Sequence, residues 1–317
     1  MPIAFDEQDL AATRKFNRVL EKLPRLRLHH PVQRAVLQGL IRFSGMVAPD
    51  TGRPKGVRIE ERLVGALGRG VGVRIFHPPS APKGVHLHIH GGGWTIGGAR
   101  QDDSINVPLA AEMDVTVVSV EYRLIPANPF QATMDDCETA ARWVLETGLQ
   151  EFGADRMTIG GESAGGHLAA ATILRLRDAG YRFDRVAGAA LTYGAYDLGG
   201  TEMRRRAGPE TLVLHGPTLP RILEKMIPPS VEARRDPALS PLQADLSGLP
   251  PALLIVGTRD PLQEDSELMH VKWQEQSGNA ELIIVPEAAH GFNKQRNSTA
   301  KKANRYIRAW IGERLSA

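Results

Sequence analysis

Residues 156–167 read RMTIGGESAGGH, and they are the most informative segment of the chain. A short strand is expected over 156–159, and a helix from about Ala164 to Ala179. Between them, GESAG at 161–165 matches the pattern G-x-S-x-G, in which a nucleophilic serine projects from a tight strand-to-helix turn. Small residues two positions on either side let the crowded turn form, and the following helix points its first amides at a developing oxyanion. In this strand–turn–helix context, a nucleophile at Ser163 and an ordinary turn are equal alternatives.

Short β-branched runs alternate with helical patterns on both sides of this turn. The alternation predicts a mostly parallel sheet with helices on both of its faces. Strands are expected at 70–76, 85–90, 115–120, 156–159, 186–191, 252–256 and 281–285, and helices at 133–147, 164–179 and 298–315. Residues 198–235 interrupt the alternation, because they are rich in glycine and proline and hold only a weak helical pattern near 219–226.

Residues 1–55 form a further region, with a helical pattern of their own. Apolar residues recur there at helical spacing: Phe16, Val19, Leu20 and Leu23. We therefore divide the chain into an N-terminal cap segment, a catalytic domain and a cap insertion: 1–55, 56–197 with 236–317, and 198–235.

Composition excludes several classes of protein. Of the 317 residues 42% are hydrophobic, which is too many for a disordered chain. The single cysteine, Cys137, rules out an intramolecular disulfide or a Cys-rich zinc module. The 39 Lys and Arg nearly balance the 36 Asp and Glu, so no nucleic-acid partner is expected. The first residues lack a signal-peptide pattern and no apolar run is long enough to span a bilayer, so we expect a cytoplasmic protein without a membrane partner.

A second motif, HGGGW at 90–94, directly follows the expected strand 85–90. Three glycines let the backbone approach a ligand closely and aim free N–H groups at it. A flexible turn is one alternative and a dinucleotide-binding loop is another. The spacing disfavours the nucleotide loop because Ile96 stands where its third glycine belongs, although Glu121 closes the next strand, where a ribose-binding acid would sit.

Three histidines, His86, His88 and His90, alternate along the same strand and so face one side of the sheet. Together they could bind a metal ion. Histidines that alternate on a buried strand are more often packed or hydrogen-bonded, and no cysteine or further ligand pattern lies nearby. We therefore expect no metal ion at these histidines.

A serine nucleophile needs a base and an acid that orients the base. His290 and Asp260 each lie just past an expected strand, where α/β sheets place their sites. Glu264 and Asp265 are alternative acids, but they fall further along, on an expected helix, where they should face solvent. The order Ser163, Asp260, His290 is that of the α/β-hydrolase triad.

Several motifs taken together resemble the bacterial hormone-sensitive-lipase-like esterases of the α/β-hydrolase superfamily. They are HGGGW at 90–94, EYRLIP at 121–126, GESAGG at 161–166, DPL at 260–262 and HGF at 290–292. The resemblance extends from about residue 57 to the C-terminus. It implies an α/β-hydrolase fold with a helical cap, and a serine carboxylesterase for short- to medium-chain acyl esters. It also implies a small-molecule ester substrate, no cofactor, and a possible homodimer.

The resemblance also implies roles for individual residues. The nucleophile, the orienting acid and the base would be Ser163, Asp260 and His290. The oxyanion hole would be the backbone N–H groups of Gly92, Gly93 and Ala164, with Gly91 as an open alternative to one of the first two.

The pocket wall and the substrate are less firmly implied. Trp94 and Tyr193 are candidates for the wall, and packing against the cap is an equal alternative for Trp94. Gly194-Ala195 stands where relatives often carry a proline, which leaves the substrate open. A narrowly specific amidase or deacetylase, and a ligand-binding protein on the same fold, are the competing functions.

Overall fold

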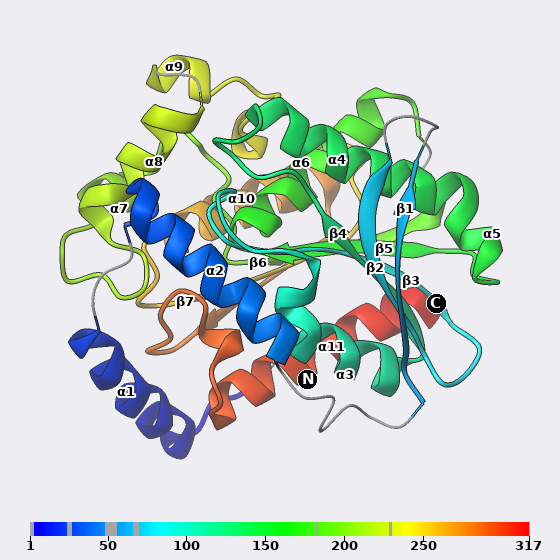
Figure 1. The fold of residues 1–317 in the computed structure, drawn as a ribbon, viewed down its shortest axis with the longest axis horizontal. Helices are drawn as coiled ribbons and strands as arrows, with labels where there is room; N and C mark the ends of the chain where they lie inside the picture. The colour runs from blue at the N-terminus through cyan, green and yellow to red at the C-terminus, as the bar shows by residue number, and fades with distance from the viewer. Residues whose placement is uncertain are drawn as a thin grey trace.

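The computed structural model describes residues 3–23, 27–47, 56–65, 70–181, 183–227 and 230–316, and the described chain is built around one eight-stranded sheet (Figure 1). Its strands are β1 (Arg58–Val64), β2 (Val71–His77), β3 (Gly84–Ile89), β4 (Val115–Glu121), β5 (Met157–Glu162), β6 (Val186–Thr192), β7 (Ala252–Gly257) and β8 (Ala280–Val285). Their order is β1-β2-β4-β3-β5-β6-β7-β8. Only the pairs β1–β2 and β2–β4 are antiparallel, so the mostly parallel sheet expected from the sequence is confirmed.

Helices cover both faces of the sheet. One face carries α3 (Asp103–Met113) and α11 (Ser298–Ser316), and the other carries α4 (Phe130–Trp143), α6 (Ala164–Asp178) and α10 (Gln263–Ser277). The central strands β3, β5 and β7 are buried along their whole length. This double burial explains why β7, ALLIVG, reads as a continuous apolar run rather than as an alternating one.

The shorter elements lie around this core. They are α1 (Glu7–Lys22), α2 (Pro31–Val47), α5 (Leu149–Glu151), α7 (Glu202–Arg206), α8 (Leu219–Met226) and α9 (Val231–Arg234). Two 3₁₀ turns matter for the site: η1 (Ala99–Asp102) and η6 (Phe292–Lys294). No helix in the described ranges is both long and apolar enough to cross a membrane.

All seven expected strands are present, with ends shifted by up to three residues. The strand that the sequence did not predict is β1, RIEERLV, a polar strand at the antiparallel edge of the sheet. The helix expected at 133–147 begins at Phe130 and continues beyond α4 as a π-helical turn over Val144–Gly148. Helix α3 was also missed, and it holds an internal proline, Pro108, which is a residue that normally argues against a helix.

The N-terminal helix α1 forms as expected, but its buried face is different from the expected one. Val19 and Leu23 are each 52% exposed, although the apolar spacing would place them inside. The buried side chains of α1 are polar: Asp9, Thr13 and Asn17. Asn17 Nδ2 donates to the Glu287 carbonyl at 2.7 Å, so polar contacts fix α1 beside the loop that leads to His290.

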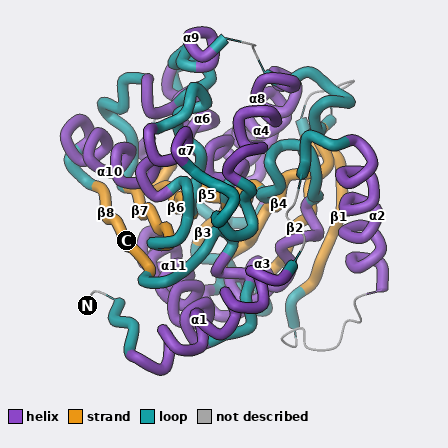
Figure 2. The backbone as a smooth tube through the Cα atoms, turned by 90° about the vertical axis from the view of Figure 1, so that its left-hand side faces the viewer, coloured by secondary structure: helices purple, strands orange, loops and turns teal. Residues whose placement is uncertain are grey.

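The second N-terminal helix, α2, reaches the segment after HGGGW. The Gln38 side chain donates to the Gly97 carbonyl at 2.9 Å and accepts from the Gly97 amide at 2.7 Å. Leu28 and Ile96 form a small apolar cluster beneath it. Figure 2 shows α1 and α2 on the outside of the sheet and its helices. Parts of the expected cap segment, residues 24–26 and 48–55, lie outside the described residues.

Candidate active site

Ser163 occupies the sharp turn between β5 and α6. Its backbone has φ 57° and ψ −118°, a conformation that few residues with a side chain adopt. The turn requires glycine on both sides, because a Cβ at Gly161 or Gly165 would lie 2.3 or 1.9 Å from the Ile89 carbonyl oxygen. The end of β3 therefore presses directly on this turn, and the small residues of G-x-S-x-G permit that contact.

A chain of hydrogen bonds joins the three residues that the sequence put forward. His290 Nε2 lies 2.8 Å from Ser163 Oγ, and His290 Nδ1 lies 2.7 Å from Asp260 Oδ2. An ionised carboxylate only accepts hydrogen bonds, so Nδ1 carries the proton and Nε2 is left to accept from the serine hydroxyl. The other oxygen of Asp260, Oδ1, accepts from the Leu262 amide at 2.9 Å, which holds the carboxylate in place.

The alternative acids do not reach this histidine. Asp265 is fully buried rather than facing solvent, so that expectation was wrong. Its carboxylate accepts from the Tyr196 and Asp197 amides at 2.8 and 3.1 Å and from Thr201 Oγ1 at 2.7 Å. Burial raises the pKa of Asp265, and these donors and Arg204 oppose that shift. The residue anchors the chain that leads into segment 198–235.

The glycine loop follows β3 and lies against the serine turn. Gly92 and Gly93 have φ of 127° and 56°, and a Cβ at Gly92 would lie 2.1 Å from the Ile96 carbonyl oxygen. A Cβ at Gly91 would lie 2.8 Å from the Glu162 carbonyl oxygen, so the loop contacts the turn backbone to backbone. Among the described residues, nothing accepts a hydrogen bond from the amides of Gly92, Gly93 or Ala164.

The side chain of His90 supports the glycine loop. Its ring stacks on Tyr122 with centroids 4.1 Å apart, and its Nδ1 lies 2.8 Å from the Gly91 carbonyl oxygen. Burial lowers the pKa of His90 to about 4, so the imidazole is neutral. Glu121 has a similar bracing role, because its Oε2 accepts from the Ala99 amide at 2.5 Å. This hydrogen bond gives Glu121, which stands where a ribose-binding acid would sit, a structural role.

The two candidate wall residues lie mostly inside the protein. Trp94 is 5% exposed and packs edge-on against Phe130 and His167, with centroids 6.0 and 5.4 Å apart. Tyr193 is 1% exposed, and its ring lies 4.7 Å from that of His290. Its hydroxyl donates to Asn293. Tyr193 is therefore placed to support the base, and little of its surface is open to a substrate.

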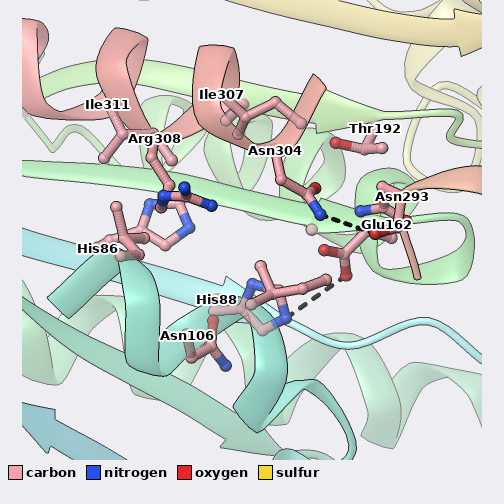
Figure 3. A pocket seen from close by; sticks show the side chains of 14 residues that line it. His86, His88, Asn106, Glu162, Thr192, Asn293, Asn304, Ile307, Arg308 and Ile311 are labelled. Carbon is pink, nitrogen blue, oxygen red and sulfur yellow. Dashed lines mark hydrogen bonds and ion pairs between the residues drawn. The ribbon is translucent and has the colours of Figure 1, made fainter. Parts of the chain in front are cut away.

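The histidines of β3 have separate partners. His86 Nδ1 lies 2.9 Å from Thr158 Oγ1, whereas His88 Nε2 lies 3.0 Å from Asp102 Oδ2. Within the described ranges one group has the spacing of metal ligands, His88, Asp102 and Glu162 (Figure 3 shows the first and last). Lys294 Nζ lies 2.5 Å from Asp102 Oδ1 and already supplies a positive charge there. The sequence analysis missed Asp102 and Lys294, because neither belongs to a motif.

Comparison with known proteins identifies the family. The family described as alpha/beta hydrolase fold matches residues 86–294. The carboxylesterase NlhH of Mycobacterium tuberculosis is 32% identical over 250 residues, which cover 74% of this chain and 76% of that protein. The chain belongs to the hormone-sensitive-lipase-like carboxylesterases of the α/β-hydrolase superfamily. It is an ester-hydrolysing serine hydrolase, as the sequence predicted.

Two further relatives support this assignment. The ethyl acetate hydrolase of Pseudomonas putida is 32% identical over 237 residues, covering 71% of this chain and 72% of its own length. The solved structure of a bacterial heroin esterase superposes with a TM-score of 0.86 at 28% identity, covering 96% of this chain and 98% of that one. The α/β-hydrolase fold expected from the sequence is therefore confirmed.

Proposed function

We propose that this carboxylesterase hydrolyses short- to medium-chain acyl esters through an acyl-enzyme formed on Ser163, with His290 as the base and Asp260 as the residue that orients it. The observation that carries the proposal is the hydrogen-bond chain from Ser163 Oγ through both nitrogens of His290 to Asp260. Nucleophile, base and orienting acid are the parts that acyl transfer by a serine requires.

The chemistry follows from the direction of these hydrogen bonds. Ser163 Oγ attacks the ester carbonyl carbon while His290 Nε2 takes the hydroxyl proton. Asp260 keeps the proton of His290 on Nδ1 and stabilises the imidazolium that forms. The imidazolium then gives its Nε2 proton to the leaving alcohol. Water repeats the sequence on the acyl-enzyme, and the carboxylic acid leaves.

The oxyanion of each tetrahedral intermediate would lie among the amides of Gly92, Gly93 and Ala164. Each such donor typically contributes roughly 3–4 kcal/mol to stabilising the transition state. The left-handed φ of Gly92 and Gly93 turns the loop backbone here, and the contact of Gly91 with Glu162 fixes its distance from the serine. We keep Gly91 as an alternative donor.

The substrate range rests on the relatives and on the N-terminal segment. One relative is named for a small ester, ethyl acetate, and another for heroin. Leu28 approaches the glycine loop so closely that a Cβ at Gly93 would lie 3.0 Å from its Cδ1. Residues 1–55 and 198–235 would thus form a cap over residues 56–197 and 236–317, with Trp94 and Tyr193 behind the pocket wall. A homodimer, a cytoplasmic location and the lack of nucleic-acid and membrane partners stay predictions.

The test is hydrolysis of p-nitrophenyl esters from acetate to dodecanoate by wild type, Ser163→Ala and Asp260→Asn. Turnover should be highest at short or medium chains and absent in Ser163→Ala. Asp260→Asn should keep the fold and lose about 10⁴ in kcat, since the wrong histidine tautomer is then favoured. Circular dichroism of each variant checks that it is folded.

Two outcomes would contradict the proposal. Undiminished turnover by Ser163→Ala would remove Ser163 from the mechanism. A folded wild type that cleaves amides but no ester would favour a narrowly specific amidase or deacetylase.

A further inference from the structure

Four charged side chains form one chain behind the catalytic residues. Lys294 Nζ lies 2.5 Å from Asp102 Oδ1, Asp102 Oδ2 lies 3.0 Å from His88 Nε2, and that nitrogen lies 3.4 Å from Glu162 Oε2. The side chains come from four separate segments, and their charges alternate in sign. This charged chain of side chains lies on the α3 and α11 face of the sheet, opposite α6.

Each of these segments also carries part of the proposed active site. Glu162 directly precedes Ser163, and His88 lies two residues before the glycine loop begins at His90. Asp102 ends η1, just beyond that loop, and Lys294 ends η6, four residues after His290. The charged chain therefore ties the nucleophile, the oxyanion loop and the base to one another.

Burying these charged side chains costs free energy that apolar side chains packed in the same place would not cost. His88, Asp102 and Glu162 are 2%, 1% and 4% exposed, and the Lys294 side chain is 33% exposed. Buried ion pairs often stabilise a fold no better than apolar side chains of similar volume would, whereas loss of one partner is strongly destabilising. A functional reason for the network is the more economical explanation.

A small cavity adjoins the end of this chain at Glu162 (Figure 3). Its volume is about 30 Å³, and His86, Asn106 and Thr192 help to line it. Asn106 is fully buried, and neither its Nδ2 nor its Oδ1 has a hydrogen-bond partner among the described residues. Glu162 Oε2 also lacks one there. This cavity offers one donor and two acceptors around a space large enough for at least one water molecule.

We propose that the Lys294–Asp102–His88–Glu162 chain positions the serine turn against the glycine loop, and that the cavity binds one water molecule bridging Asn106 to Glu162. The inference rests on the proposed function. The link to chemistry is the Glu162 backbone, whose carbonyl oxygen touches the glycine loop at Gly91. A Glu162 side chain held by the His88 ion pair and by the bridging water fixes that peptide, and with it the distance from Ser163 to the oxyanion donors.

A metal ion in place of the water is the competing occupant. His88, Asp102 and Glu162 have suitable spacing. However, Lys294 and His88 already balance the two carboxylates, so a divalent ion would add an uncompensated double charge to a buried site. A neutral water molecule suits the charge balance better.

The ionisation of Glu162 gives the proposal a distinctive readout. Burial raises the pKa of Glu162 to about 7, with the Asp102 carboxylate adding to the effect and His88 opposing it. The titratable or charged groups around this carboxyl and its cavity are His86, His88, Asp102, Tyr122, Tyr193, Lys294 and Arg308. Above pH 7 the ionised side chain pairs with His88, so its hold on the serine turn should grow as the pH rises through 7.

The first experiment compares Glu162→Gln with wild type on p-nitrophenyl acetate from pH 6 to 9. At pH 6 the two kcat values should agree within about twofold, because glutamine resembles the protonated acid. At pH 8.5 the variant should be about 10-fold slower with KM within about twofold, since small misplacements of reacting groups cost up to about 100-fold. Glu151→Gln, a change at an exposed carboxylate paired with Arg62, is the matched control and should equal wild type.

Lys294→Met tests the other end of the chain at a partly exposed residue, where the fold should tolerate the change. It should lower kcat by about 10-fold with KM within about twofold. Ser163→Ala in the same series separates a failure of the proposed function from a failure of the positioning role. If it is inactive while Glu162→Gln and Lys294→Met match wild type at every pH, the proposed function stands and the positioning role is wrong. A loss in Glu162→Gln that does not change with pH also overturns the positioning role.

A crystal structure of the wild type at a resolution that shows waters tests the cavity. A single peak about 2.7–3.2 Å from both the Asn106 amide and Glu162 Oε2 is the expected result. An empty cavity would overturn the water site. So would a peak about 2.0–2.6 Å from two or more of His88, Asp102 and Glu162, which is the distance range of a bound metal ion.

Discussion

The two faces of the sheet at Ser163 are built on opposite principles. On the α6 side the backbone of the serine turn packs against β3 so tightly that Gly161 and Gly165 have no room for a methyl group. On the α3 and α11 side, Glu162 extends into a buried group of polar side chains that encloses a cavity of about 30 Å³. Sterics define the first face, and charge and hydrogen bonding define the second.

This difference shows which parts of such a site can be recognised in the amino-acid sequence. A steric requirement for glycine leaves a mark at fixed spacing, because no other residue fits. A charge network produces no such motif. Its residues come from segments that are distant in sequence, and several residue types can supply the charge or hydrogen bond needed at each position. Variants on each side should therefore fail in different ways.

Gly165→Ala should have the largest effect, on the steric face. Its Cβ would lie 1.9 Å from the Ile89 carbonyl oxygen, so β3 or α6 would have to move, and we expect a loss of about 3 kcal/mol in the free energy of unfolding, the upper end of the usual cost of overpacking. Activity should be lost too, because Ile89 directly precedes the glycine loop. Thermal unfolding and p-nitrophenyl acetate turnover measure the two effects.

Gly39→Ala is the matched control, since it is the same change within a helix. A Cβ at Gly39 would have nothing within 4 Å, so alanine should leave α2 as stable or make it slightly more stable. Equal stability of the two alanine variants would show that the contact between the serine turn and β3 can relax, and that steric fit does not define this face.

The extent of prediction from sequence follows the same division. Ser163, Asp260 and His290, which lie far apart in the chain, were assigned from motifs at strand ends, and the structure brings them within hydrogen-bond distance of one another. Asp265 was misjudged because a carboxylate in the first turn of a helix usually faces solvent, whereas here backbone amides from a distant segment bury it. The buried face of α1 was also misjudged, because its polar side chains make hydrogen bonds to distant segments, as Asn17 does to the Glu287 carbonyl.

Glu162→Gln should have an intermediate effect on stability, with a definite sign against pH. The folded carboxyl keeps its proton up to a pH near 7, whereas its ordinary pKa is 4.5. Between these values the folded state binds more protons than the unfolded state, so the free energy of unfolding falls as pH rises through this window. Glutamine removes this effect. The stability of the variant relative to wild type should therefore rise between pH 4.5 and 7, by up to about 3 kcal/mol.

Urea unfolding at several pH values measures this difference. Glu151→Gln again serves as the control and should show a difference that does not vary with pH. A flat difference for Glu162→Gln as well would mean that burial does not raise the pKa of this carboxyl, and that the pH-dependent part of the positioning role is wrong.

Thr158→Val should have the smallest effect, and it tests whether the polar face is one network or separate pairs. Thr158 Oγ1 lies 2.9 Å from His86 Nδ1, and both side chains are buried on the same face as Glu162. Burial lowers the pKa of His86 to about 3, so this is a hydrogen bond between neutral groups. Valine keeps the shape but leaves a buried ring nitrogen without its partner, which should cost about 1–2 kcal/mol.

The double variant His86→Phe with Thr158→Val completes this test. Replacing both partners by apolar groups of similar shape can be nearly neutral, so it should recover most of the stability lost in Thr158→Val. Because the pair touches neither Ser163 nor the glycine loop, kcat on p-nitrophenyl acetate should stay within about twofold in both variants. A clear fall in kcat in the single variant would instead join His86 and Thr158 to the charged chain and make the polar face one cooperative unit, since coupled networks give more than the sum of their pairs.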